Sequence, residues 1–205
     1  MTEVKATLGV RYYPASKVAN PIAAQTRRDG KMKHIFVATD GSDAAARAVD
    51  EAAALSAALN IPLSIGHVLQ FGRPAEELAR MADVEHMVRH VNKESGVDFA
   101  NVPDTMIDLF KDTRPRDDTI RLITVIGDEI LRRAADRAKE LGAEVDKTRT
   151  SAGDTADSII DMAEGTGADA IALGHRGLGR LKTVLLGSVA QKVISHAECT
   201  VISVR

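Results

Sequence analysis

Gly174-His-Arg-Gly177-Leu-Gly-Arg-Leu-Lys-Thr-Val-Leu-Leu-Gly187-Ser188 is the glycine-rich segment that decides the fold of this chain. Its glycines follow the spacing G-x-x-G, nine residues, G-S. The apolar run 170–173 before it predicts a buried strand, and residues 189–196 after it predict a helix. This combination suits a phosphate site, because glycine lets backbone N–H groups approach an anion and a helix N-terminus attracts negative charge.

The spacing excludes two common phosphate loops. A P-loop has lysine directly before its serine or threonine, and no lysine precedes Ser188. A dinucleotide-binding loop starting at Gly177 would need glycine or alanine at position 182, where this chain has lysine. From spacing alone, a glycine-rich turn without a ligand is an equal alternative.

Apolar runs and helical periodicities alternate over much of the chain, which predicts a parallel sheet with helices on both faces. Strands are expected at 35–38, 63–68, 145–150, 170–173 and 200–204, and helices at 43–59, 120–141, 155–164 and 189–196. We expect the first helix to bury one apolar face, made of Ala45, Val49, Ala52, Leu55 and Leu59. Gly127 is expected to interrupt the second helix.

The segment from Gly174 to Val189 resembles the universal stress protein family, in whose ATP-binding members this glycine spacing recurs. The resemblance extends to Lys192-Val-Ile, Cys199–Arg205, His34–Ser42, His67-Val68 and Gly153-Asp154. It implies an α/β fold of the adenine nucleotide alpha hydrolase type, a doubly wound five-stranded parallel sheet of order 3-2-1-4-5. In that order the first and fourth strands lie side by side at the topological switch point, where open sheets bind ligands.

Two segments lie outside the resemblance. Residues 1–32 are expected to be a basic N-terminal arm, because their only acids are Glu3 and Asp29. Residues 33–205 are expected to be the universal stress protein domain. Within it, residues 71–118 are expected to be a helical insert, since the family usually has a shorter connection there.

The resemblance and the chemistry of the side chains together give a nucleotide site. Backbone N–H groups of the glycines and of Ser188 would surround the phosphates, Asp40 would accept from ribose hydroxyls, and Val68 would pair with adenine. Asp40 and Ser188 could also hold Mg²⁺, although a turn carboxylate is an alternative role for Asp40. The expected site residues are Ala38, Thr39, Asp40, Val68, Leu173, Gly174, His175, Arg176, Gly177, Gly187, Ser188 and Val189.

His175 departs from the small residue that is common at this position in the family. Its imidazole could stack on the nucleotide, hydrogen-bond to it, or narrow the pocket. The sequence leaves these three roles open.

The leading functional interpretation is an ATP-binding, nucleotide-sensing regulatory homodimer in the stress response, with Mg²⁺ as a further ligand. The final strand, 199–205, would pair with its two-fold mate, and an unknown protein partner would receive the signal. The chain shows no Walker, kinase or G-x-S-x-G motif, so at most slow ATP hydrolysis is expected. A slow ATPase or adenylate-transferring enzyme and a nucleotide-free interaction module are the alternatives.

Composition limits the kinds of protein and partner that the chain is compatible with. Hydrophobic residues make up 44% and charged residues 27% of the chain, as in ordinary globular proteins. A net charge of −2 does not favour nucleic acid as a partner. No apolar run approaches the ~18 residues of a membrane span. With a single cysteine, Cys199, and no recognisable secretory signal, a cytoplasmic location is expected.

Overall fold

Five parallel strands form one sheet in the part of the chain that the computed structural model describes, residues 32–69, 117–176 and 186–205. The strands are β1 (Ile35–Ala38), β2 (Leu63–Leu69), β3 (Val145–Ala152), β4 (Ala170–Gly174) and β5 (Thr200–Val204). Their order is β3-β2-β1-β4-β5, which confirms the predicted topology. The expected N-terminal arm, except Met32, and the expected helical insert, except residues 117–118, fall outside the described residues.

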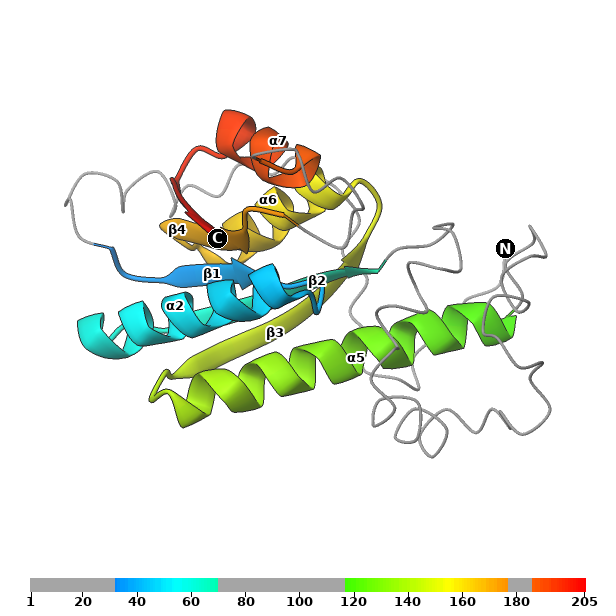
Figure 1. The fold of residues 1–205 in the computed structure, drawn as a ribbon, viewed down its shortest axis with the longest axis horizontal. Coiled ribbons are helices and arrows are strands. Elements are labelled where there is room, and N and C mark those ends of the chain that lie inside the picture. The colour runs from blue at the N-terminus through cyan, green and yellow to red at the C-terminus, as the bar shows by residue number, and fades with distance from the viewer. Residues whose placement is uncertain (1–31, 70–116, 177–185) are drawn as a thin grey trace.

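Four described helices cover the two faces of this sheet. They are α2 (Asp43–Leu59), α5 (Asp117–Glu140), α6 (Thr155–Thr166) and α7 (Ser188–His196). Helices α2 and α5 lie on one face and α6 and α7 on the other (Figure 1). None of the described helices is both long enough and apolar enough to span a bilayer.

Each face of the sheet has its own apolar core. Because successive strand residues point to opposite faces, Ile35 and Val37 of β1 enter the α2–α5 core, while Phe36 and Ala38 enter the α6–α7 core. All four residues of β1 are buried, as expected of a central strand with helices on both sides. Because both faces of β1 are buried, the strand is apolar throughout, and it can be recognised in the sequence as a continuous apolar run.

Helix α2 begins where it is predicted to begin, but two of the residues predicted for its buried face are exposed. Ser42 is the N-cap, and its Oγ accepts a hydrogen bond from the Ala45 N–H at 3.3 Å. Leu55 and Leu59 are 36% and 51% exposed, so their expected burial is wrong. The buried stripe repeats at four-residue intervals and holds small residues: Ala44, Ala45, Ala48, Val49, Ala52, Ala53 and Ser56. Small side chains bring the helix axis close to the sheet, and the two leucines lie off that stripe.

Helix α5 runs without a break through Gly127, so the expected interruption is wrong. A Cβ at Gly127 would lie 2.6 Å from Leu69 Cδ2 and 3.0 Å from His67 Cδ2. The absence of a side chain therefore lets α5 approach β2 closely. The glycine serves packing between elements that lie far apart in the sequence.

Candidate functional site

The turn after β1 brings polar groups to the carboxyl edge of the sheet. β1 ends with Ala38 opposite Gly66 of β2 and Leu173 of β4. The Thr39 N–H then donates to the Gly66 carbonyl at 2.9 Å, which extends the contact with β2 by one bond. Beyond Thr39 the chain turns outward toward α2, at the point where the order of strands reverses.

Asp40 has a structural role in this turn. Its Oδ1 accepts a hydrogen bond from the Ser42 N–H at 3.0 Å, and Thr39 Oγ1 accepts from the Gly41 N–H at 3.3 Å. Gly41 has a φ of +79°, a conformation that side-chain-bearing residues rarely adopt. The turn-carboxylate role foreseen as an alternative for Asp40 is thus present. A carboxylate has about four acceptor sites, so this role does not exhaust it.

Gly174 ends β4 against the first turn of α2. A Cβ at this position would lie 2.8 Å from the Ala44 carbonyl carbon and 2.9 Å from the Ala45 nitrogen. The glycine is therefore required for packing between β4 and α2, whatever ligand binds nearby. This close approach places the end of β4 beside the Asp40 turn, as the sheet order predicts.

A backbone hydrogen bond closes the glycine-rich loop at its base. The Gly187 N–H donates to the His175 carbonyl at 2.8 Å, and we call this bond the loop clasp. The His175 N–H and its Nδ1 both contact the Val204 carbonyl, at 2.6 Å and 3.0 Å. The His175 imidazole is therefore anchored to β5, which favours none of the three nucleotide roles considered for it.

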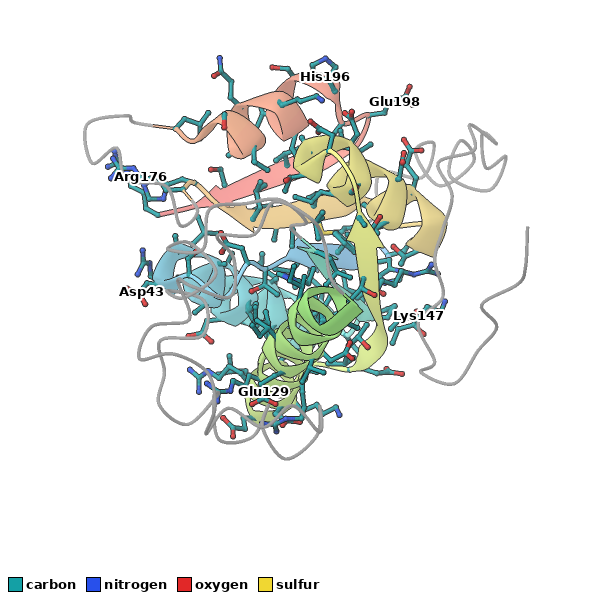
Figure 2. All side chains as sticks on the ribbon, turned by 90° about the vertical axis from the view of Figure 1, so that its right-hand side faces the viewer. Asp43, Glu129, Lys147, Arg176, His196 and Glu198 are labelled. Carbon is teal, nitrogen blue, oxygen red and sulfur yellow. The ribbon has the colours of Figure 1, made fainter. Side chains whose placement is uncertain are left out.

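The N-terminus of α7 has no side-chain cap. Gly187 occupies the N-cap position, where serine or aspartate would normally bond the first N–H groups. Ser188, the first residue of the helix, is exposed. Nearby, Arg176 Nε is buried and has no hydrogen-bond partner among the described residues. In Figure 2, Arg176 and Asp43, at the start of α2, lie along the same side of the molecule.

The remaining predicted site residues are buried at the strand ends. Ala38, Val68 and Leu173 are 8%, 5% and 4% exposed and belong to the α6–α7 core, and Thr39 is 7% exposed. Val189 packs against the same core. The fold therefore brings all the described site residues to one edge of the sheet. Gly177 lies outside the described residues.

His67 contributes to this edge in a way that the sequence did not indicate. Its side chain is 2% exposed, and Nδ1 lies 2.8 Å from the Thr39 carbonyl oxygen. Burial lowers the pKa of His67, partly offset by the bond to Thr39 and by the nearby Asp40 carboxylate. Sequence alone connects His67 only with the family resemblance, because its hydrogen-bond partner lies 28 positions away in the chain.

No group of three or more histidine, cysteine, aspartate or glutamate side chains in the described ranges could hold a metal ion. A divalent cation here would therefore need ligands from the nucleotide phosphates or water, as Mg²⁺ commonly has.

Comparisons with known proteins agree with the fold and identify the family. A profile described as "Universal stress protein family" matches residues 31–205. Universal stress protein YxiE of Bacillus subtilis is 32% identical over 171 residues, covering 83% of this chain and 97% of the relative. A universal stress protein solved in complex with cAMP is 26% identical, with a TM-score of 0.52 and coverage of 85% and 97%. UspA from Lactobacillus plantarum has a TM-score of 0.56 at 22% identity, covering 85% of this chain and 99% of that chain.

Proposed function

The chain belongs to the universal stress protein family, and we propose that it binds an adenine nucleotide, ATP foremost, and reports that binding as a regulatory protein in the stress response. One observation carries the proposal. The Asp40 turn and the uncapped start of α7 converge on the switch point between β1 and β4, where open sheets bind ligands. The relative solved with cAMP, 26% identical, supports an adenine nucleotide as the ligand class.

The phosphates would bind at the start of α7. The first N–H groups of any helix lack intrahelical partners, and Gly187 supplies no side chain to satisfy them. A phosphate would accept from the N–H groups of Ser188 and Val189 and from the Ser188 hydroxyl. Arg176 Nε, buried and unpartnered in the described residues, would supply a cationic donor.

The nucleoside would extend from this point toward β2. Asp40 would accept from ribose hydroxyls, and with Ser188 it would hold Mg²⁺ mainly through water. The backbone at Val68 would pair with the adenine edge, beside the buried side chains of Ala38 and Leu173. Gly174 is assigned no specific contact with the phosphates, because the close contact with α2 already requires glycine at this position.

We propose binding without rapid turnover. Near the strand ends, the described histidines are His67 and His175, and both are bonded to backbone carbonyls, of Thr39 and Val204. Neither is placed as a general base for an attacking water. A slow ATPase would instead show turnover well above background that is lost in Asp40→Ala.

Thermal unfolding with and without nucleotide tests the proposal. Ligand at a hundredfold excess over Kd adds about 2.7 kcal/mol to stability. For a chain of 205 residues this corresponds to a Tm increase of about 5–10 °C. ATP–Mg²⁺, AMP and cAMP are compared with no ligand. The absence of a shift with every nucleotide at millimolar concentration would favour the nucleotide-free interaction module.

Two serines of α7 form a matched pair that locates the site. Ser188 lies at the proposed phosphate position, whereas Ser195 lies in the last turn, where its Oγ donates to the Gln191 carbonyl at 2.9 Å. Loss of one hydroxyl–phosphate hydrogen bond should weaken ATP binding about tenfold in Ser188→Ala. Ser195→Ala should bind as the wild type does. Equal effects in the two variants would place the phosphates elsewhere.

We also propose a homodimer through β5. This strand is at the sheet edge, and its ladder with β4 includes Thr200 N–H to the Asp169 carbonyl at 3.1 Å. By the alternation of a strand, the N–H of Ser203 points outward, available to a second copy. Ser203→Pro should therefore give monomers in sedimentation experiments, while Ser203→Ala stays dimeric. A dimeric proline variant would contradict this interface.

A further inference from the structure

We infer that His67 is a positioning residue that fixes the Asp40 turn relative to Val68, and through it the fit of nucleotides that carry ribose hydroxyls. The inference rests on the proposed nucleotide site and adds a residue to it. His67 itself would touch neither base, ribose nor phosphate. Its effect would pass through the backbone of its neighbours.

The hydrogen bond of His67 joins two strands beyond the end of their ladder. The last backbone bond between β2 and the β1 segment is from the Thr39 N–H to the Gly66 carbonyl. One residue farther along β2, the His67 ring reaches the carbonyl of the same Thr39 at 2.8 Å. Thr39 is therefore held on both its N–H and its C=O, and the next residue is Asp40. The residue after His67 is Val68.

The polarity of this bond is fixed by chemistry. A carbonyl oxygen can only accept, so Nδ1 must carry the proton and donate it. Burial lowers the pKa of His67, and the neutral ring therefore stays in the tautomer that keeps this donor. The Asp40 carboxylate is close enough to act on the ring electrostatically.

Packing holds the ring in the orientation that this bond needs. His67 is 2% exposed, and Gly127 of α5 lies directly against its edge, since a Cβ there would be 3.0 Å from Cδ2. A bulky helix residue would push the ring away from Thr39. Glycine at position 127 therefore leaves the space that the imidazole of His67 occupies when it bonds to Thr39, the residue before Asp40.

Replacing His67 with asparagine or with leucine tests the hydrogen-bond donor separately from the filling of the space. Both side chains branch at Cγ, as histidine does, but only asparagine offers an N–H near the place of Nδ1. We expect ATP to bind about tenfold more weakly to His67→Leu than to the wild type. In His67→Asn the loss should be within about threefold. Thermal unfolding confirms that each variant is folded.

A nucleotide without ribose hydroxyls distinguishes the placement of Asp40 by His67 from a general disturbance of the binding site. With Mg²⁺ left out, so that only the ribose contact of Asp40 is compared, loss of Asp40 placement should weaken ATP but leave 2′,3′-dideoxyadenosine triphosphate nearly unaffected. In a double-mutant cycle, His67→Leu should add little to the loss in Asp40→Ala, because both act on one interaction. Equal weakening of the two nucleotides, additive effects in the cycle, or wild-type affinity in His67→Leu would each overturn the inference.

Failure of the proposed function would look different, because wild-type protein would then bind neither triphosphate. Should His67→Leu not fold, the wild type itself gives a test by NMR of ¹⁵N-labelled histidine. The Nδ1–H signal of His67 should shift on saturation with ATP and much less with the dideoxy analogue. An unchanged signal with both ligands would overturn the inference.

Discussion

Replacing Gly174 with alanine separates two reasons for glycine at this position. An added Cβ would lie 2.8 Å from the Ala44 carbonyl carbon and 2.9 Å from the Ala45 nitrogen. Favourable contacts between carbon atoms lie at about 3.5–4.0 Å. Both neighbouring atoms belong to the backbone of α2, so neither can rotate away as the end of a side chain could. The strand or the helix must shift.

The expected loss of stability follows from this geometry. Overpacking a well-packed site costs about 1–3 kcal/mol, and a backbone contact belongs in the upper half of that range. Gly174→Ala should therefore unfold about 5–10 °C below the wild type in a chain of 205 residues. The measurement is thermal unfolding in the absence of nucleotide, repeated as a urea titration.

Gly165→Ala is the matched control. Gly165 lies in α6, and the nearest atom to its added Cβ is Arg149 Nη1 at 4.0 Å. Alanine favours the helix by up to about 1 kcal/mol over glycine, so this variant should be unchanged or slightly more stable. Unfolding of Gly174→Ala within about 2 °C of the wild type would contradict a packing role for this glycine. Loss of ATP affinity alone would then show that the glycine serves only the ligand.

Substitutions at three further positions test the rest of the fold. Glu129 is buried, accepts from Arg132 and Arg133, and has a pKa lowered to about 2 (Figure 2). Because its folded pKa lies below the unfolded value of 4.5, its contribution is full above that pH and is lost as pH falls toward 2. Glu129→Gln should cost about 1–3 kcal/mol at neutral pH in urea titrations, with the difference shrinking over that window. Asp154→Ala should cost about 1 kcal/mol by the same assay, because Asp154 caps α6, whereas Asp154→Asn should change little. Gly66→Ala should cost about 3 kcal/mol or prevent folding, judged by circular dichroism, since its Cβ would clash with the ring of the buried Phe36. Wild-type stability in Gly66→Ala, a pH-independent Glu129→Gln deficit, or equal losses in the two Asp154 variants would contradict the respective assignments.

Local pattern was enough to predict the strands and the helix starts. Ile35–Ala38 is apolar throughout because both its faces are buried, and Ser42 precedes the alanine-rich helix that it caps. These signals lie within a few residues of the structure that they specify. The order of the strands is a different matter, because pairing between β1 and β4 joins residues far apart in sequence. Only the family resemblance predicts that order.

Long-range contact explains what the sequence did not predict. Gly127 looked like a helix breaker, but it makes room for β2, and Leu55 looked like a core residue although the small side chains of α2 occupy the interface. His67 bonds to a backbone carbonyl 28 positions away in the chain. Each of these depends on which element lies opposite, and periodicity within one segment carries no such information.

The loop clasp has a consequence for how this protein could change over time. It joins the Gly187 N–H and the His175 carbonyl, so it depends on no side chain between them. At this bond the Gly187 nitrogen lies 2.8 Å from the His175 oxygen. Closing a longer loop costs only slightly more free energy, about 0.6 kcal/mol for each doubling of length. The bond itself therefore tolerates substitutions and changes of length between its two partners, so this segment can vary while the end of β4 stays joined to the start of α7.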